Sequence, residues 1–113
     1  MSERIRRIGE NEAVFRSVND QIRGLSQTFT TAKETMSVVC ECGMSSCVDR
    51  FQVHPEDYVA VREDSTLFLI KPGHDFPETE TVVEKTDAYW IVRKDPGEPA
   101  ELARSTDPRP NAS

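Results

Sequence analysis

The sequence has little of what a membrane-bound or secreted protein needs. No apolar run reaches the roughly 18 to 20 residues of a membrane span, and the N-terminus lacks the hydrophobic stretch of a secretion signal. Hydrophobic residues make up 36% of the 113, and 30% are charged, so the core of one small domain is thin. We expect a cytoplasmic protein whose core has support besides apolar burial, such as a structural metal.

Positive charge is scarce outside the first third of the chain. Residues 1–35 hold six basic and five acidic side chains, whereas the rest hold eight basic and fifteen acidic ones. The net charge of the whole chain is -6. An acidic body repels a phosphate backbone and disfavours nucleic-acid binding. DNA binding through Arg4, Arg6 and Arg7, at the start of a predicted helix, is kept as an alternative.

Cysteine is rare, but all three cysteines lie within eight positions, as Cys40, Cys42 and Cys47 in the pattern C-x-C-x4-C. Thiols stay reduced in the cytoplasm, so such a cluster indicates metal ligands or a redox site rather than disulfides. The pattern favours zinc in a structural site, because an iron–sulfur cluster usually takes four cysteines. Glu41 and two serines between the thiols predict a polar setting rather than an apolar core.

The fourth ligand has to come from elsewhere in the chain. His54 lies at the far end of a predicted strand, at a helix-cap position, whereas His74 lies in a Pro-Gly-His loop that is free to fold back over the thiols. We therefore expect His74 to complete a Cys3His site. The alternatives are His54, or a shell without histidine that Asp49, Asp75 or water completes.

Hydrophobic periodicity predicts an α+β fold. A long N-terminal helix, residues 1–30, packs on a small antiparallel sheet of two hairpins with a short helix, and a structural metal site ties them together. The helix carries one apolar stripe, formed by Ile5, Ile8, Phe15, Val18, Ile22, Leu25 and Phe29.

The remaining elements follow from local patterns. Strands are expected over 36–42 and 48–53, with a tight turn at Gly43, then a helix from Pro55 to about residue 63, an apolar core turn over 67–70, and a hairpin of 79–85 and 88–94, in which Tyr89 and Trp90 are expected to pack on the sheet. The predicted zinc-stabilised domain spans 1–94, with 36–94 as the metal-binding body. Residues 95–113 are expected to be a mobile acidic, proline-containing tail with at most a helical turn.

Several segments together resemble a family of small uncharacterised proteins from actinomycete bacteria. The resemblance covers about residues 8–94 and rests on four segments of this chain: NEAVFRSVN at 11–19, CECG at 40–43 with Cys47, EDYVAVR at 56–62 and PGH at 72–74. The chain departs from the family at 44–46, where acidic residues are more usual. In that family Pro-Gly-His accompanies the cysteines, which implies a ligand role for His74. The family brings no established activity.

The predicted function is that of a non-enzymatic protein-interaction or regulatory module. A closed Cys3His site leaves no metal position for water, and no nucleophile and base stand at a recognisable spacing, so a metal-dependent hydrolase is disfavoured and no small-molecule substrate is evident. A protein partner, or a second copy of the chain, is expected to contact the N-terminal helix near Ile5 and Ile8. A redox-responsive zinc–thiolate switch is the other alternative.

Overall fold

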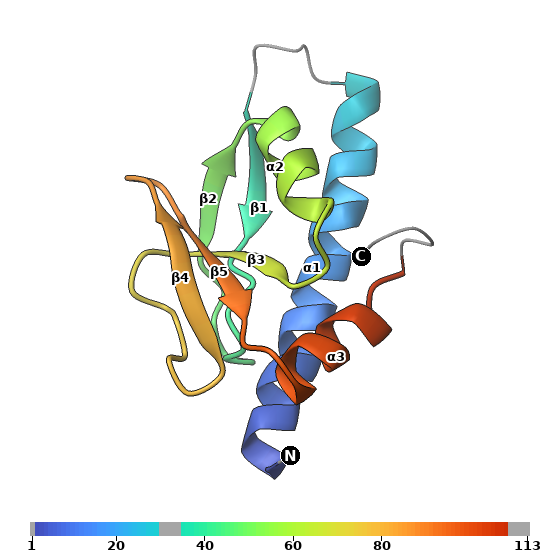
Figure 1. The fold of residues 1–113 in the computed structure, drawn as a ribbon. Helices are drawn as coiled ribbons and strands as arrows, with labels where there is room; N and C mark the ends of the chain where they lie inside the picture. Colours follow the sequence, from blue (N-terminus) through green and yellow to red (C-terminus); the bar gives the residue numbers. More distant parts are fainter. Residues whose placement is uncertain (1, 30–34, 109–113) are drawn as a thin grey trace.

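One long helix, α1 (Glu3–Phe29), runs along the molecule, and two small antiparallel sheets lie to one side of it (Figure 1). The computed structural model describes residues 2–29 and 35–108. The other elements are β1 (Met36–Val39), β2 (Arg50–Val53), α2 (Pro55–Arg62), β3 (Leu67–Ile70), β4 (Glu80–Lys85), β5 (Trp90–Lys94) and α3 (Glu98–Ser105). The predicted α+β fold with a long N-terminal helix is confirmed.

The buried face of α1 is more polar than its apolar periodicity predicts. Among the side chains of α1 that the structure describes, the buried ones follow one helical stripe and are Ile8, Glu12, Arg16 and Asn19. Val14 and Val18 are instead 60% and 39% exposed, so the prediction that Val18 faces the sheet is wrong. The side chains of Leu25 and Phe29 lie outside the described part of the structure.

The polar stripe of α1 is buried because the sheets and α3 supply partners for it. Arg16 donates to the carbonyl oxygens of Ser65 and Ala103, at 2.6 and 2.9 Å, and its guanidinium lies 4.5 Å from the centre of the Phe68 ring. Asn19 exchanges two hydrogen bonds of 2.8 Å with the backbone of Val39. A buried polar group with such partners avoids the desolvation penalty of an unpaired one.

The strands form two sheets rather than one. Strands β1 and β2 make a two-stranded hairpin in which Val38 lies opposite Phe51, and β3, β5 and β4 make a three-stranded sheet in that order. The predicted turn over 67–70 is instead strand β3, because its apolar residues pair with those of β5, as in Leu69 opposite Ile91.

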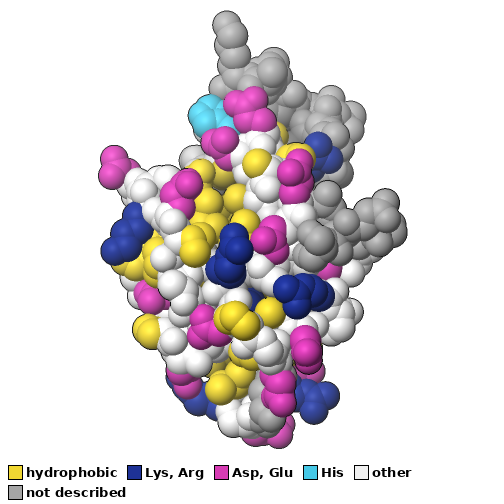
Figure 2. Space-filling view, viewed as in Figure 1, with side chains coloured by type: hydrophobic (Ala, Val, Ile, Leu, Met, Phe, Trp, Pro, Cys, Tyr) yellow, Lys and Arg dark blue, Asp and Glu magenta, His cyan; other side chains and the backbone are white. Residues whose placement is uncertain are grey.

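Apolar side chains join the two sheets. Phe51 of β2 stacks on Tyr89, with the ring centroids 5.5 Å apart, and Tyr89 and Trp90 pack against the buried core as predicted. Hydrophobic side chains gather where β2 and β5 approach each other (Figure 2). The main core consists of Met36, Val38, Cys40, Cys42, Phe51, Val53, Tyr58, Val61, Phe68, Leu69, Ile70, Ile91, Val92 and Ala103.

Helix α2 begins at Pro55, as predicted. Its last residue, Arg62, bonds it to α1. The buried guanidinium of Arg62 bonds the carboxylates of Asp20, at 2.8 and 3.0 Å, and of Asp107, at 2.9 and 2.8 Å. Tyr58 also donates to Asp20, at 2.7 Å. These bonds connect α1, α2 and the residues after α3.

The segment predicted to be a tail contributes to the core instead. Residues 98–105 form α3, whose small side chains Ala100 and Ala103 are buried, and Figure 1 shows α3 lying across α1. The proline, glycine and charged residues in and around this helix made its sequence resemble that of a tail. Residues 109–113 of the predicted tail lie outside the described part of the structure.

Candidate metal centre

The four predicted ligands come together from three separate segments. Cys40 and Cys42 follow β1, Cys47 lies in the loop before β2, and His74 lies in the turn after β3. One potential ligand atom from each of them lies within 4.8 Å of all the others. Within residues 2–29 and 35–108 no other residue belongs to this group, so the structure favours His74 over the alternatives His54, Asp49 and Asp75 as the fourth ligand. His54 is exposed at the N-cap of α2.

The distances within this group, called the Cys3His cluster below, suit a small tetrahedral ion. His74 Nδ1 lies 3.6 Å from Cys40 Sγ and 3.7 Å from Cys47 Sγ. A tetrahedral zinc ion bound by sulfur at about 2.3 Å and by nitrogen at about 2.0 Å places these two donor atoms about 3.5 Å apart. The two distances from His74 Nδ1 to sulfur are therefore close to those around a tetrahedral zinc ion.

Cys40 and Cys42 lie in the segment between β1 and β2, which is hydrogen-bonded to both sheets. Strand β1 ends at Val39, three residues short of the prediction, because the next two backbone N–H groups bond in different directions. Cys40 N–H bonds Asp49 O, at 2.9 Å, across the hairpin, whereas Glu41 N–H bonds Leu69 O, at 2.8 Å, in β3. The metal-binding segment is therefore hydrogen-bonded to both sheets, to the β1–β2 hairpin through Cys40 and to β3 through Glu41.

Two tight turns bring the other ligands back to this segment. A bond of 3.0 Å from Cys47 N–H to Met44 O closes the loop between the cysteines. In the Pro-Gly-His turn, His74 N–H bonds Lys71 O, at 3.0 Å, and Gly73 has a φ of 86°. Such a φ strongly favours glycine, which explains why a glycine directly precedes His74.

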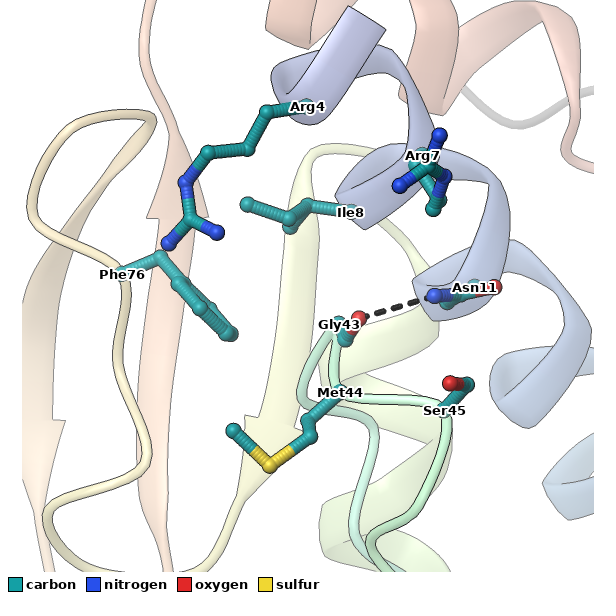
Figure 3. A pocket seen from close by; sticks show the side chains of 8 residues that line it. All are labelled: Arg4, Arg7, Ile8, Asn11, Gly43, Met44, Ser45 and Phe76. Carbon is teal, nitrogen blue, oxygen red and sulfur yellow. Dashed lines mark hydrogen bonds between the residues drawn. The ribbon is translucent and has the colours of Figure 1, made fainter.

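Helix α1 packs directly on the metal-binding loop at Gly43 (Figure 3). A Cβ atom at this position would lie 2.8 Å from the carbonyl oxygen and 2.9 Å from the Cα of Ile8. Asn11 Nδ2 donates to Gly43 O, at 2.9 Å. Gly43 is therefore required by the close approach of the helix, and the chain bends at this residue with a φ that is not positive.

Glu41 is a buried carboxylate between two ligands, contrary to the polar, open setting that the sequence predicts. Cys40, Glu41 and Cys42 are 1%, 1% and 2% exposed. The carboxylate accepts hydrogen bonds from Asn19 Nδ2, at 2.7 Å, and Leu69 N, at 3.0 Å. Burial raises the pKa of Glu41 to about 7. Its bonds hold the metal-binding segment to α1 on one side and to β3 on the other.

Each thiol accepts a backbone N–H. Lys71 N–H bonds Cys40 Sγ, at 3.2 Å, and the N–H groups of Met44 and Asp49 bond the sulfurs of Cys42 and Cys47. The N–H groups of Lys71, Met44 and Asp49 each lower the pKa of the thiol that they bond, because donors of this kind stabilise sulfur in its anionic, metal-binding form.

In the metal-free cluster the thiols share their protons unequally. A hydrogen bond from the Cys40 thiol lowers the pKa of Cys42 to about 5 and raises the pKa of Cys40. Burial raises the pKa of Cys47. A cation bound by the cluster would replace the shared thiol proton as the partner of these sulfurs.

No protein-family model, curated protein or solved structure matches this chain. The resemblance to the actinomycete family therefore stays a prediction. Among the residues that the structure describes, no helix is both long and apolar enough to cross a membrane.

Sequence reasoning missed the supporting residues of the Cys3His cluster. Glu41 was judged only as part of a polar stretch, and no role was predicted for Asn19. For Asn19 the available signal is its place in the buried stripe of α1, three residues after Arg16, whereas Glu41 lies outside the helices and offers no such signal. Ile8, Glu12 and Arg16 of the same stripe follow one another at a four-residue spacing.

Proposed function

We propose that Cys40, Cys42, Cys47 and His74 bind a zinc ion that stabilises a cytoplasmic, non-enzymatic protein-interaction module. The observation that carries the zinc site is the convergence of three thiols and one imidazole within 4.8 Å. Three sulfur donors and one nitrogen donor form a typical structural zinc set, and they fill a tetrahedral shell with protein ligands alone. Such a shell leaves no coordination position on the ion for a reacting water, which supports a structural role.

The metal proposal is tested by the zinc content of protein purified under anaerobic conditions without added metal. We expect one zinc per chain in the wild type and less than one in Cys47→Ser and His74→Ala. His54→Ala is the matched control, because His54 lies outside the cluster, and it is expected to keep the full zinc content. Wild-type protein that contains no zinc, and takes up none on addition, would contradict the proposal.

The interaction proposal places the partner on the outer face of α1. Val14 and Val18 lie one helical turn apart and are among the exposed large hydrophobic residues. Ile8, expected earlier to contact a partner, is buried against the metal-binding loop instead. We therefore assign the protein-binding role to Val14 and Val18, with either another protein or a second copy of the chain as partner.

A photo-crosslinking amino acid at position 14 tests this face inside cells. We expect a discrete crosslinked product, to one protein or to a second copy, that disappears when Val18→Asp is added. The same amino acid at Gln52, on the exposed side of β2, is the control. Equal crosslinking from both positions, or none from position 14, would contradict an interaction through α1.

The arginines at the start of α1 give little support to DNA binding. Arg4 bonds Glu78 at 3.0 Å, and Arg6 lies 3.9 Å from Glu10, so both cations already face an acid.

A redox-responsive zinc site has more support, since Cys47 is the most exposed of the three thiols. Zinc release by one equivalent of hydrogen peroxide supports that version, whereas retention of zinc contradicts it.

A further inference from the structure

Asp49 touches three of the four residues of the Cys3His cluster. Its carbonyl oxygen accepts the Cys40 N–H, at 2.9 Å, and its own N–H bonds Cys47 Sγ. Its carboxylate Oδ2 lies 3.6 Å from His74 Nε2. The residue precedes β2 directly, so the regular hairpin fixes its backbone while its side chain reaches across to the Pro-Gly-His turn.

The two ring nitrogens of His74 face different groups. Nδ1 points at the sulfurs of Cys40 and Cys47, whereas Nε2 points at the Asp49 carboxylate. A neutral imidazole carries its proton on one nitrogen and offers a lone pair on the other. A carboxylate beside Nε2 favours the proton there and leaves the Nδ1 lone pair directed into the cluster.

We infer that Asp49 is a positioning residue of the metal centre: its carboxylate accepts the Nε2–H of His74 and so holds the ring in the orientation and tautomer that bind metal through Nδ1. The inference rests on the zinc site proposed above. It changes the role of Asp49 from a possible fourth ligand to a partner of the fourth ligand. The half-exposed carboxylate lies within ion-pair distance of Nε2, a few tenths of an ångström beyond a hydrogen bond.

The first test is the zinc affinity of side-chain variants, measured by competition with a chromophoric chelator. Loss of such a partner costs about 10- to 100-fold in metal affinity, which is the decrease expected for Asp49→Ala. Asp49→Asn is expected to lie between Asp49→Ala and the wild type, because an amide oxygen still accepts the Nε2–H. Asp75→Ala removes the same charge from the residue next to His74 and is expected to bind zinc like the wild type.

The second test separates positioning from general stability. Nitrogen-15 NMR of the zinc-bound wild type is expected to show the His74 ring bound through Nδ1 and protonated at Nε2. The urea midpoint of the metal-free protein is expected to be the same with and without Asp49→Ala, since this carboxylate is half-exposed.

Three results would overturn the inference: binding of His74 through Nε2, wild-type affinity in Asp49→Ala, or an equal loss of affinity in Asp75→Ala. Wild-type protein that binds no zinc contradicts the proposed function itself. If the wild type and Asp49→Ala both bind zinc, and do so equally tightly, only the proposed role of Asp49 is contradicted.

Discussion

Two clusters of ionisable side chains, one buried and one partly buried, hold the body to α1, and they differ in the source of their cation. In the first, the lysine cluster, Lys94 Nζ lies 2.7 Å from a carboxylate oxygen of Glu12 and 3.0 Å from one of Glu80. In the second, the Cys3His cluster, three thiols and an imidazole lie together with no basic side chain in the group. The chain encodes the cation of the lysine cluster, whereas the Cys3His cluster has to take its cation from solution.

The lysine cluster sets two buried acids against one buried cation, and Lys94 lies within ion-pair distance of both acids. Burial, and then the neighbouring Glu80, raise the pKa of Glu12 well above its usual value. A further bond, from Phe76 N–H to Glu80 at 2.9 Å, fixes the Glu80 carboxylate. The comparison teaches that this cluster is complete on folding, whereas the Cys3His cluster is complete only after an ion binds.

Removal of metal is expected to have the largest effect on stability. Structural zinc contributes about 10 kcal/mol or more in small zinc domains, and here the cluster lies where β1, β3 and α1 meet. Unfolding in urea, followed by circular dichroism, is expected to shift to much lower urea when a chelator is added to the zinc-bound protein. An unchanged midpoint in excess chelator would show that the metal does not stabilise this fold.

Lys94→Met is expected to have the next largest effect. It leaves two buried carboxylates without a cation, which costs about 3 to 5 kcal/mol, while the zinc content stays at one per chain. Lys85→Met, at an exposed position, is the matched control and is expected to cost less than about 1 kcal/mol. If Lys94→Met also loses its zinc, the two clusters are not independent and the comparison fails.

Glu41→Gln tests the carboxylate that joins the Cys3His cluster to α1. Glu41 accepts hydrogen bonds on both oxygens, whereas glutamine has to place an amide N–H against one of these donors. A buried mismatch of this kind costs about 1 to 3 kcal/mol. Urea unfolding of the zinc-bound protein measures this cost, and Glu56→Gln, on the exposed surface, is the control. Equal midpoints for the two variants would contradict the bridging role of Glu41.

Tyr58→Phe is expected to have the smallest effect at neutral pH and a distinct one at high pH. It removes a hydrogen bond to Asp20 that is worth about 1 kcal/mol. Burial raises the pKa of Tyr58 above its unfolded value. The folded protein therefore keeps a phenol proton that the unfolded chain loses above about pH 10, and stability falls as the pH rises through that range.

Unfolding of both proteins between pH 8 and pH 11 measures this difference. The wild type is expected to lose stability more steeply above about pH 10 than Tyr58→Phe. Parallel curves over the whole range would mean that the Tyr58 phenol ionises as readily in the folded protein as in the unfolded chain.

The Cys3His cluster was accessible to sequence reasoning because its signal is local. Three thiols in eight positions, and a histidine after Pro-Gly, are rare combinations, and the structure brings these four residues together. The two hairpins and α2 were predictable for the same reason, because alternation, turn residues and Pro55 act over a few positions.

The remaining features depend on contacts between distant segments. The α1 stripe was assigned to apolar residues, but Arg16 and Asn19 are buried because Ser65 and Val39 supply backbone partners that periodicity does not reveal. Strand β3 depends on pairing with β5, about two dozen residues later. Helix α3 was taken for a tail because its small alanines form a core face only against α1.

X-ray absorption at the zinc edge tests the central claim most directly, because it reads the donor atoms and their distances around the bound ion. The account predicts three sulfurs at about 2.3 Å and one nitrogen at about 2.0 Å, and a shell of two sulfurs or fewer in Cys47→Ser. A wild-type shell with fewer than three sulfurs, or one completed by oxygen in place of imidazole nitrogen, would contradict the Cys3His centre.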